Sequence, residues 1–328
     1  MHFVLFTRSV CSSAKRELRE SAEHHGEDNS HGSHFGYRDT EEWGKSYPSC
    51  SGTRQSPIDL NSYEMARLDV PSPLKWQGYR RPPRNMTLGN NGHTVELSAS
   101  WDADETPYIS GGPLEDDYAF VQLHFHWGPR DDVGSEHTIN NHSLPLEMHM
   151  VHYKKNYGSV SEALQHEDGL AVVGILFEVK KNRRCSQGLR NIKPFPLSQF
   201  NLDFPDEYVA YMGSLTTPPC SEIVTWILPA IPRYLTEEQL DLFRSIELAG
   251  GDDHNFRPTK PHNGQKHYNL SIESIGKLRN TEECENKQDT YKRCVLHGMI
   301  KSAVDDVEFR RARNSPLESL RRFYLDVF

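Results

Sequence analysis

Two histidines near the middle of the chain have the spacing of metal ligands on a strand. In the segment 121–127, which reads Val-Gln-Leu-His-Phe-His-Trp, His124 and His126 are separated by one residue. Successive side chains of a strand point to opposite faces, so this alternation places Gln122 and both imidazoles on one face. The apolar residues between them fall on the other face, which predicts a half-buried strand with two imidazoles pointing the same way.

A second segment about twenty residues later repeats this arrangement. The residues 147–151 read Glu-Met-His-Met-Val, which places Glu147 and His149 on one face of a second predicted strand. Pairing of the two strands would bring three imidazoles together. Three neutral imidazoles that leave the fourth tetrahedral position open are typical of a catalytic zinc site, whereas structural zinc sites use four protein ligands.

The simpler alternative is that these histidines only form hydrogen bonds in a core or at a surface. The residues that precede them favour the metal site. Gln122 and Glu147 each lie two residues before a histidine and on the same face, where each can accept the outer ring N–H and fix the tautomer. We therefore expect one Zn²⁺ held by His124, His126 and His149.

Composition excludes several other classes of function. The 328 residues carry 37 Lys and Arg against 46 Asp and Glu, a formal net charge of −9, which disfavours binding to nucleic acid or to anionic membranes. The longest apolar run, Leu170–Phe177, is far shorter than the roughly 20 residues of a membrane-spanning helix. The length fits either two domains or one large sheet domain.

Short strands separated by Gly, Pro and Asn turns dominate residues 43–277. The clearest are expected at 120–127, 147–152, 171–179 and 223–228. Thr236 and Gln239 form a capping-box pattern before an apolar helical repeat, and a shorter helix is expected over residues 160–166.

Both ends of the chain differ from this central part. Residues 15–34 are polar and charged, so we expect a mobile segment over residues 1–34, and the short apolar start Met1–Phe6 could be the remnant of a signal peptide. Residues 278–328 are expected to be a C-terminal extension with a helix after Ser315. Cys284 and Cys294 in this extension could form a small disulfide loop.

Six cysteines without a CxxC pair make disulfides possible but do not require them. The sequons at Asn85, Asn141 and Asn269 are possible glycosylation sites and favour a secretory route. Cys185 has no obvious partner except Cys11 or a thiol of another molecule, and an unpaired surface cysteine is the simpler interpretation.

Six motifs, in this order and spacing, resemble those of the alpha-class carbonic anhydrases over residues 35–276. The motifs are Gln55–Asp59 (QSPID), Asn91–His93 (NGH), His124–Gly128 (HFHWG), Gly134–Thr138 (GSEHT), Glu147–His152 (EMHMVH) and Ser214–Pro219 (SLTTPP). The resemblance implies a mainly β (α+β) fold, with one domain at 35–277 around a large, twisted, mostly antiparallel sheet of about ten strands and a few short peripheral helices.

The resemblance also implies a reaction, the reversible hydration of carbon dioxide to bicarbonate and a proton by attack of zinc hydroxide. It assigns the same three histidines as zinc ligands and adds Asn255 as a residue that supports them. It further implies that Thr216 accepts the hydrogen of the hydroxide and donates its own to Glu136, and that His93 is the proton shuttle. Sulfonamides and anions are the expected inhibitors.

Further residues acquire roles only through the resemblance. The residues that match its apolar carbon dioxide pocket are Val151, Val172, Leu215, Thr217 and Trp226. Cys50 and Cys220 match the two positions that are bridged in secreted and membrane-bound members, so the resemblance implies a disulfide and a secreted or extracellular location. Glu96 lies at a cavity-mouth position where a neutral side chain is common, so it could change proton transfer or inhibitor affinity.

Two other functions stay open at the level of sequence. One is a non-catalytic carbonic-anhydrase-related module that uses the fold for extracellular recognition, although such modules usually lack a ligand histidine and this chain has all three. The other is a zinc protein whose biological role resides in the extension 278–328, for example in attachment to a matrix or a partner.

Overall fold

A computed structural model gives the structure of the chain. The residues that it describes are 35–61, 65–70, 72–102, 104–180, 194–200, 207–229, 231–261, 263 and 267–271. Contacts divide the chain into two units, Met1–Ile275 and Gly276–Phe328, and every described residue belongs to the first. The predictions for segments 1–34 and 278–328 and for Cys11, Cys185, Cys284 and Cys294 lie outside the described residues.

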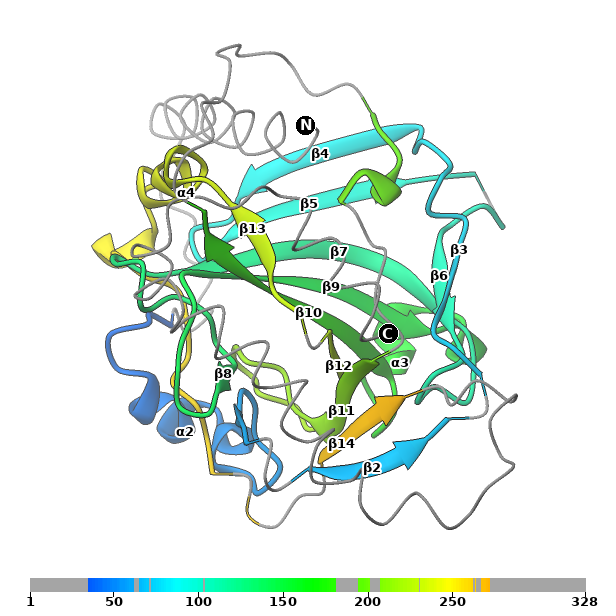
Figure 1. Cartoon of the computed structure of the whole chain (residues 1–328), viewed down its shortest axis with the longest axis horizontal. Coiled ribbons are helices and arrows are strands. Elements are labelled where there is room, and N and C mark those ends of the chain that lie inside the picture. The colour runs from blue at the N-terminus through cyan, green and yellow to red at the C-terminus, as the bar shows by residue number, and fades with distance from the viewer. Residues whose placement is uncertain are drawn as a thin grey trace, which may run out of the picture. The chain divides into compact units, whose positions relative to one another are not determined.

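One large sheet forms the framework of the first unit (Figure 1). In chain order its strands are β2 (Ala66–Asp69), β3 (Lys75–Gln77), β4 (Asn85–Asn90), β5 (Val95–Ser100), β6 (Tyr108–Ser110), β7 (Tyr118–Trp127), β9 (Leu146–Lys154), β10 (Leu170–Val179), β11 (Glu207–Gly213), β12 (Val224–Pro229), β13 (Arg233–Leu235) and β14 (His267–Ser271). The longest strands lie in the middle of the sheet, where both of its faces can be covered.

Among the described residues the sheet has twelve strands, and its continuous order is β2-β14-β11-β12-β10-β9-β7-β5-β4. Strand β13 pairs with β10, and β6 pairs with both β3 and β7. Most neighbours are antiparallel, whereas β10 is parallel to β12 and β13, and β14 is parallel to β2. The predicted fold class, mainly β around one large and mostly antiparallel sheet, is confirmed. A separate parallel pair joins β1 (Asp59–Leu60) to β8 (Thr138–Ile139).

The helices of the described residues are short and lie at the edges of the sheet (Figure 1). The α-helices are α2 (Trp43–Ser46), α3 (Val160–Ala163) and α4 (Glu237–Arg244), and the 3-10 helices are η1 (Thr40–Glu42), η2 (Pro48–Ser51), η3 (Lys155–Tyr157), η4 (Leu197–Phe200) and η5 (Ala249–Gly251). None of the helices among these residues is long and apolar enough to cross a membrane.

Helix α4 begins as its sequence predicts. The Thr236 side chain accepts from the backbone N–H of Gln239, and the Gln239 side chain accepts from the backbone N–H of Thr236. This capping box satisfies donors that have no partner inside the first helical turn. Leu240 and Phe243 are fully buried on the inner face of the helix, and the Phe243 ring lies 4.9 Å from that of Phe125 in β7.

The alternation along β7 separates a core face from a polar face. Leu123, Phe125 and Trp127 are at most 1% exposed and belong to the larger apolar cluster, which also includes Leu240 and Phe243 of α4. Burial of three such side chains contributes about 1.5–3 kcal/mol each. A slip of one residue would turn them to the other face, so their burial fixes the register of β7 and the direction of His124 and His126.

His152, in β9, is a buried histidine on the core face. Its Nε2 lies 2.5 Å from the Tyr79 hydroxyl and its Nδ1 lies 3.3 Å from the carbonyl oxygen of Ala171. Aromatic rings surround it, with the centroids of Phe120 and Trp76 at 5.9 and 6.4 Å. Burial lowers the pKa of His152 to about 3, so it is neutral in the folded protein at neutral pH.

This depressed pKa predicts a dependence of stability on pH. Between pH 6.5 and about 3 the unfolded chain binds a proton at His152 that the folded chain does not, so His152 makes the free energy of unfolding fall as the pH falls. The destabilisation caused by His152→Gln should therefore be roughly 2 kcal/mol smaller at pH 5 than at pH 7. Urea unfolding of the zinc-free proteins measures this difference.

The exposed His142 provides the control, since His142→Gln should leave the pH dependence of unfolding close to that of the unmodified protein. Parallel pH dependences for the unmodified protein and His152→Gln would show that the folded state does not depress the pKa of His152.

Candidate metal centre

The pairing of β7 with β9 brings three histidines together. His124 lies opposite His149, and His126 lies opposite Glu147, in the antiparallel register. The ring centroids are 5.0 Å apart for His124 and His126, 5.2 Å for His124 and His149, and 4.5 Å for His126 and His149. One nitrogen of each ring lies within 4.8 Å of the corresponding nitrogens of the other two, close enough to share one metal ion.

Two outer nitrogens are held by side chains of the same strands. His124 Nδ1 lies 2.8 Å from Gln122 Oε1, and His149 Nε2 lies 2.7 Å from Glu147 Oε1. In each pair the ring N–H donates to the oxygen, which leaves the other ring nitrogen as an acceptor. The free positions are therefore Nε2 of His124 and Nδ1 of His149. The sequence predicts these two hydrogen bonds, because Gln122 and Glu147 each lie two residues before a histidine on the same face of a strand.

The third outer nitrogen is held from another part of the chain. His126 Nδ1 donates to the carbonyl oxygen of Asn255 at 2.7 Å, and the Asn255 side chain accepts from the backbone N–H of Trp127. His126 Nε2 is buried and has no hydrogen-bond partner in the described part of the chain. A buried acceptor without a partner is unfavourable, and a cation at this point would satisfy it.

All three rings have the neutral form that metal binding needs. Burial, followed by the neighbouring His149, lowers the pKa of His126 to about 3. Burial, followed by the two neighbouring imidazoles, also holds the pKa of His124 well below 6.5, and burial lowers that of His149. His126 and His149 are each only 1% exposed, whereas His124 is partly exposed, so the site opens to solvent beside His124. The donor set fits Zn²⁺.

Glu147 connects two histidines through one carboxylate. Its Oε1 lies 2.7 Å from both His149 Nε2 and His137 Nδ1, and its Oε2 accepts the backbone N–H groups of Glu136 and His137. Although burial alone would raise the pKa of Glu147, the two histidines hold it well below its usual value. The carboxylate is therefore ionised, which orients the His149 ring and makes it a better donor of electron density.

A chain of hydrogen bonds runs on from His137. Its Nε2 lies 2.6 Å from the Tyr211 hydroxyl, which donates to Ser56 Oγ at 2.9 Å, and Ser56 Oγ accepts the backbone N–H of Ser214. The chain connects the histidine cluster to the loop that carries Thr216. Sequence reasoning missed His137, Tyr211 and Ser56. The only signal in the sequence was that His137 and Ser56 lie inside two of the six motifs of the family resemblance.

Thr216, Glu136 and Arg257 meet beside the histidines. The backbone N–H of Arg257 donates to Glu136 Oε1 at 2.8 Å, whereas Glu136 Oε2 is buried and has no hydrogen-bond partner among the described residues. Burial and then Glu147 raise the pKa of Glu136 well above its usual value, whereas the neighbouring Thr216 and Arg257 lower it. A divalent cation nearby would favour the ionised carboxylate.

The side chain of Arg257, 1% exposed, holds the N-terminal part of the site in place. It donates to Gln55 Oε1 and to the carbonyl oxygens of Ser56 and Cys50 at 2.9–3.1 Å. A buried guanidinium needs such partners, and loss of any one is costly. The sequence did not identify Arg257, because an isolated arginine carries no local signal of burial.

The structure contains the disulfide between Cys50 and Cys220 that the family resemblance implies. The loop 214–221 also has internal hydrogen bonds, including one from the backbone N–H of Cys220 to the carbonyl oxygen of Thr217 at 2.9 Å. The loop that carries Thr216 is thus covalently tied to the N-terminal segment.

An apolar cluster lies next to the histidines, on the face of the sheet opposite to the larger core. Val151, Val172 and Trp226 are at most 9% exposed and belong to this cluster, and the partly buried Leu215 packs against it. The Trp226 ring centroid lies 4.8 Å from that of His149. The structure thus brings these predicted pocket residues together at one side of the candidate metal position.

His93 lies at the turn between β4 and β5, outside the group of three histidines. Its ring is partly exposed and stacks on Phe35, with centroids 4.0 Å apart and planes at 9°. Asn91 Oδ1 accepts its backbone N–H, and the Asn255 side chain donates to its carbonyl oxygen at 3.0 Å. Asn255 therefore contacts both His93 and His126.

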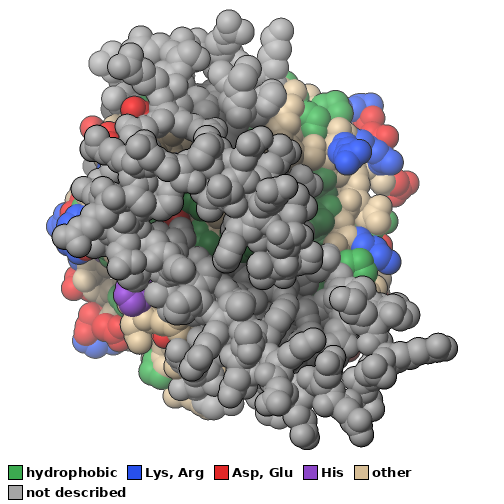
Figure 2. Space-filling view, viewed as in Figure 1, with side chains coloured by type: hydrophobic (Ala, Val, Ile, Leu, Met, Phe, Trp, Pro, Cys, Tyr) green, Lys and Arg blue, Asp and Glu red, His purple; other side chains and the backbone are tan. Residues whose placement is uncertain are grey.

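Asn85 and Asn141, in two of the three sequons, are exposed. Asn269 lies in β14, and its side chain is outside the described part of the chain. Acidic and basic side chains both appear around the edge of the described surface in Figure 2, and neither sign covers an extended part of it in that view.

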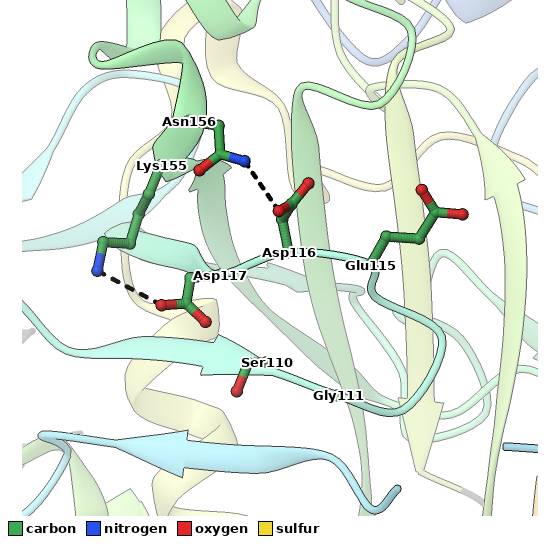
Figure 3. Close-up of a pocket in the computed structure, with 7 residues that line it drawn as sticks. All are labelled: Ser110, Gly111, Glu115, Asp116, Asp117, Lys155 and Asn156. Carbon is green, nitrogen blue, oxygen red and sulfur yellow. Dashed lines mark hydrogen bonds and ion pairs between the residues drawn. The ribbon is translucent and has the colours of Figure 1, made fainter. Parts of the chain in front are cut away.

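A cleft of about 350 Å³ lies apart from the histidines, beside β6 and η3 (Figure 3). Two of its acids are paired, Asp116 with Asn156 at 2.8 Å and Asp117 with Lys155 at 3.6 Å. Asp116 also lies 2.9 Å from Lys154. Because these side chains satisfy one another, the cleft does not present a second group of metal ligands.

Comparison with known proteins agrees with the geometry. Residues 38–269 match the family described as eukaryotic-type carbonic anhydrase. Carbonic anhydrase 7 of Mus musculus is 38% identical over 242 residues, 68% of this chain and 90% of the relative. Carbonic anhydrase 7 of Homo sapiens is 38% identical over 255 residues, which are 72% of this chain and 96% of the relative. Carbonic anhydrase 3 of Bos taurus is 32% identical over 252 residues, which are 70% of this chain and 96% of the relative.

The site predicts a graded loss of zinc affinity. His149→Ala should weaken zinc binding by more than about 100-fold, because it removes a ligand, whereas Gln122→Ala should cost only about 10-fold, because it removes a partner of a ligand. Competition with a chelator, followed by metal analysis, measures both values. The exposed His142→Ala is the control and should bind zinc normally. Retention of one tightly bound zinc per chain in His149→Ala would contradict the assignment.

Proposed function

The chain belongs to the eukaryotic-type carbonic anhydrase family, and we propose that it catalyses the reversible hydration of carbon dioxide to bicarbonate and a proton. The proposed cofactor is one zinc ion per chain, held by His124 Nε2, His126 Nε2 and His149 Nδ1. The observation that carries this proposal is the convergence of three neutral imidazoles, each with its outer nitrogen engaged and its inner nitrogen free.

Zinc bound to three neutral ligands keeps most of its positive charge and lowers the pKa of a water molecule to about 7, a value known from carbonic anhydrase itself. The protein supports this by keeping the ligands uncharged. Glu147 is the anion nearest to the ligand rings, and its charge is shared with His137 and with two backbone N–H groups.

Thr216 and Glu136 are the proposed pair that orients the nucleophile. Glu136 Oε1 accepts the backbone N–H of Arg257, and the buried Glu136 Oε2, which has no hydrogen-bond partner among the described residues, is the proposed acceptor for Thr216. When Thr216 donates its hydroxyl hydrogen to the Glu136 carboxylate, its oxygen can only accept a hydrogen from the attacking group. This directs a lone pair of that group away from Thr216 and towards the substrate.

The apolar cluster beside His149 is the proposed binding place for carbon dioxide, which has no charge and no net dipole. Val151, Val172, Leu215 and Trp226 offer such a molecule dispersion contacts and exclude water, and Thr217 adds a polar edge. Bicarbonate, which is charged, binds such a surface less well, which favours product release.

His93 is the proposed proton carrier. Its imidazole is partly exposed, and an imidazole is the type of side chain that can accept a proton from the site and pass it to buffer near neutral pH. The stack on Phe35 and the hydrogen bonds to the backbone of His93 hold the residue near Asn255 and thus near the ligand His126.

We also propose that the protein matures in an oxidising compartment and is secreted or extracellular. The Cys50–Cys220 disulfide supports this, since disulfides are rare in reducing compartments, and the exposed sequons at Asn85 and Asn141 are compatible with glycosylation. Residues 35–277 form the proposed catalytic domain. Segments 1–34 and 278–328 are proposed to be appendages to it.

The activity is tested by stopped-flow measurement of carbon dioxide hydration with the zinc-loaded protein. We expect turnover far above the buffer rate and its abolition by an aromatic sulfonamide.

His93→Ala should retain zinc and slow turnover on the order of 10-fold at low buffer concentration, because proton transfer then limits the rate. Turnover should recover as buffer is added.

A hydration rate equal to that of buffer would refute the proposed activity. A loss in His93→Ala that does not depend on buffer concentration would leave the activity intact but exclude His93 as the proton carrier.

The location is tested by peptide mapping under non-reducing conditions of the protein recovered from the cells that make it. We expect a peptide pair linked through Cys50 and Cys220, because the oxidising route forms that bond before the protein reaches its destination. Recovery of both cysteines as free thiols, together with unmodified Asn85 and Asn141, would contradict a secretory route.

A further inference from the structure

Glu96 lies next to the candidate metal centre on the sheet. Strands β5 and β7 are antiparallel, and their register places Glu96 opposite His124 and Ser98 opposite Gln122. Side chains directly opposite each other in such a pair lie on the same face, with Cβ atoms about 4.5–5.5 Å apart. The Glu96 side chain therefore leaves the sheet on the face that carries the metal-binding nitrogens, adjacent to a ligand.

Burial of its neighbours confirms this direction. Val95 and Leu97 are 1% and 0% exposed and belong to the larger apolar cluster, and Leu97 lies opposite the buried Leu123. Successive side chains of a strand alternate between faces, so Glu96 must point away from this core. The same alternation that directs His124 to the metal position thus directs Glu96 beside it.

Glu96 is also placed where the site meets solvent. Both Glu96 and His124 are partly exposed, whereas His126 and His149 are each 1% exposed, so the opening of the site is on the side of His124 and Glu96. The Ser98 hydroxyl donates to Glu96 Oε1 at 2.9 Å and holds the carboxylate in this region.

The other carboxylates of the site differ from Glu96 in burial and in hydrogen bonding. Glu136 and Glu147 are at most 1% exposed and accept backbone N–H groups, which neutralise part of their charge. Within β5 and β7, Glu96 is the only acidic residue. Glu96 is therefore the partly exposed carboxylate that lies beside His124 on these two strands.

We propose that Glu96 sets the charge selectivity of the metal cavity, weakening the binding of anionic ligands at its mouth and strengthening that of cationic ones. The inference rests on the proposed zinc site, since the ligands in question bind there. A carboxylate within about 6–10 Å of a charged ligand changes its affinity several-fold at low ionic strength, and salt screens the effect.

Three benzenesulfonamides with the same zinc-binding group provide the probe. Their para substituents are a carboxylate, a methyl group and a protonated aminomethyl group, and titration calorimetry on the zinc-loaded protein gives each Kd. Glu96→Gln should lower the ratio of the carboxylate Kd to the aminomethyl Kd by about 5- to 20-fold at low ionic strength. The methyl compound should bind both proteins equally.

Two further measurements make the assignment specific. Glu96→Lys should lower the ratio further, and 0.5 M salt should reduce the difference between the proteins. Glu115→Gln is the matched control, because it removes the same charge from an exposed side chain in the separate cleft of Figure 3.

The possible failures are distinguishable. An unchanged ratio in Glu96→Gln, or an equal change in Glu115→Gln, would overturn the selectivity role while leaving the zinc site in place. Failure of the zinc-loaded, unmodified protein to bind even the methyl compound would instead overturn the proposed metal site and the selectivity claim with it.

Discussion

The arrangement of this site follows from three imidazole nitrogens that face one another in a mostly buried space. Nitrogens of this kind must be uncharged, and each carries a lone pair that water does not fully reach. The acceptor of His126 has no partner among the described residues, and each such group costs about 1–3 kcal/mol. A divalent cation removes this cost, and the outer partners of the rings determine which nitrogens are available to it.

The sheet holds these nitrogens in place because the metal face and the core face belong to the same strands. Burial of Leu123, Phe125 and Trp127 in the larger apolar cluster fixes β7, and the pairing of β7 with β9 then places His124 opposite His149. The network through Glu147 and His137 extends this order to the loop of Thr216, which a disulfide also restrains. The packing of the core therefore determines both the positions of the three histidines and that of the loop that carries Thr216.

Much of this could be predicted from local patterns in the sequence. Strands β7, β9, β10 and β12 and helix α4 lie close to their predicted places because alternation and caps are local signals. Gln122 and Glu147 could be found because each lies on the same strand as its histidine. Helix α3 ends at Ala163, three residues before its predicted end, which shows how weakly a short helix is defined by sequence.

Contacts made through the backbone or across long separations could not be found in this way. The Asn255 carbonyl oxygen that accepts from His126 is 129 residues away in the sequence, and every residue type has such a backbone oxygen, so the residue type gives no signal. Arg257 donates to partners more than 200 residues away. Tyr211 and Ser56 are 155 residues apart in the sequence, and no local pattern indicates that they meet. The disulfide was inferred only through resemblance to a family.

The central claim is that one zinc ion takes three imidazole nitrogens from this chain and keeps a coordination position for solvent. X-ray absorption at the zinc edge of the loaded protein measures this directly. The account predicts three nitrogen neighbours and one oxygen neighbour at about 2.0–2.1 Å, with no sulfur. A zinc–sulfur distance near 2.3 Å, or a first shell that is unchanged when His124, His126 and His149 are all replaced by alanine, would contradict it.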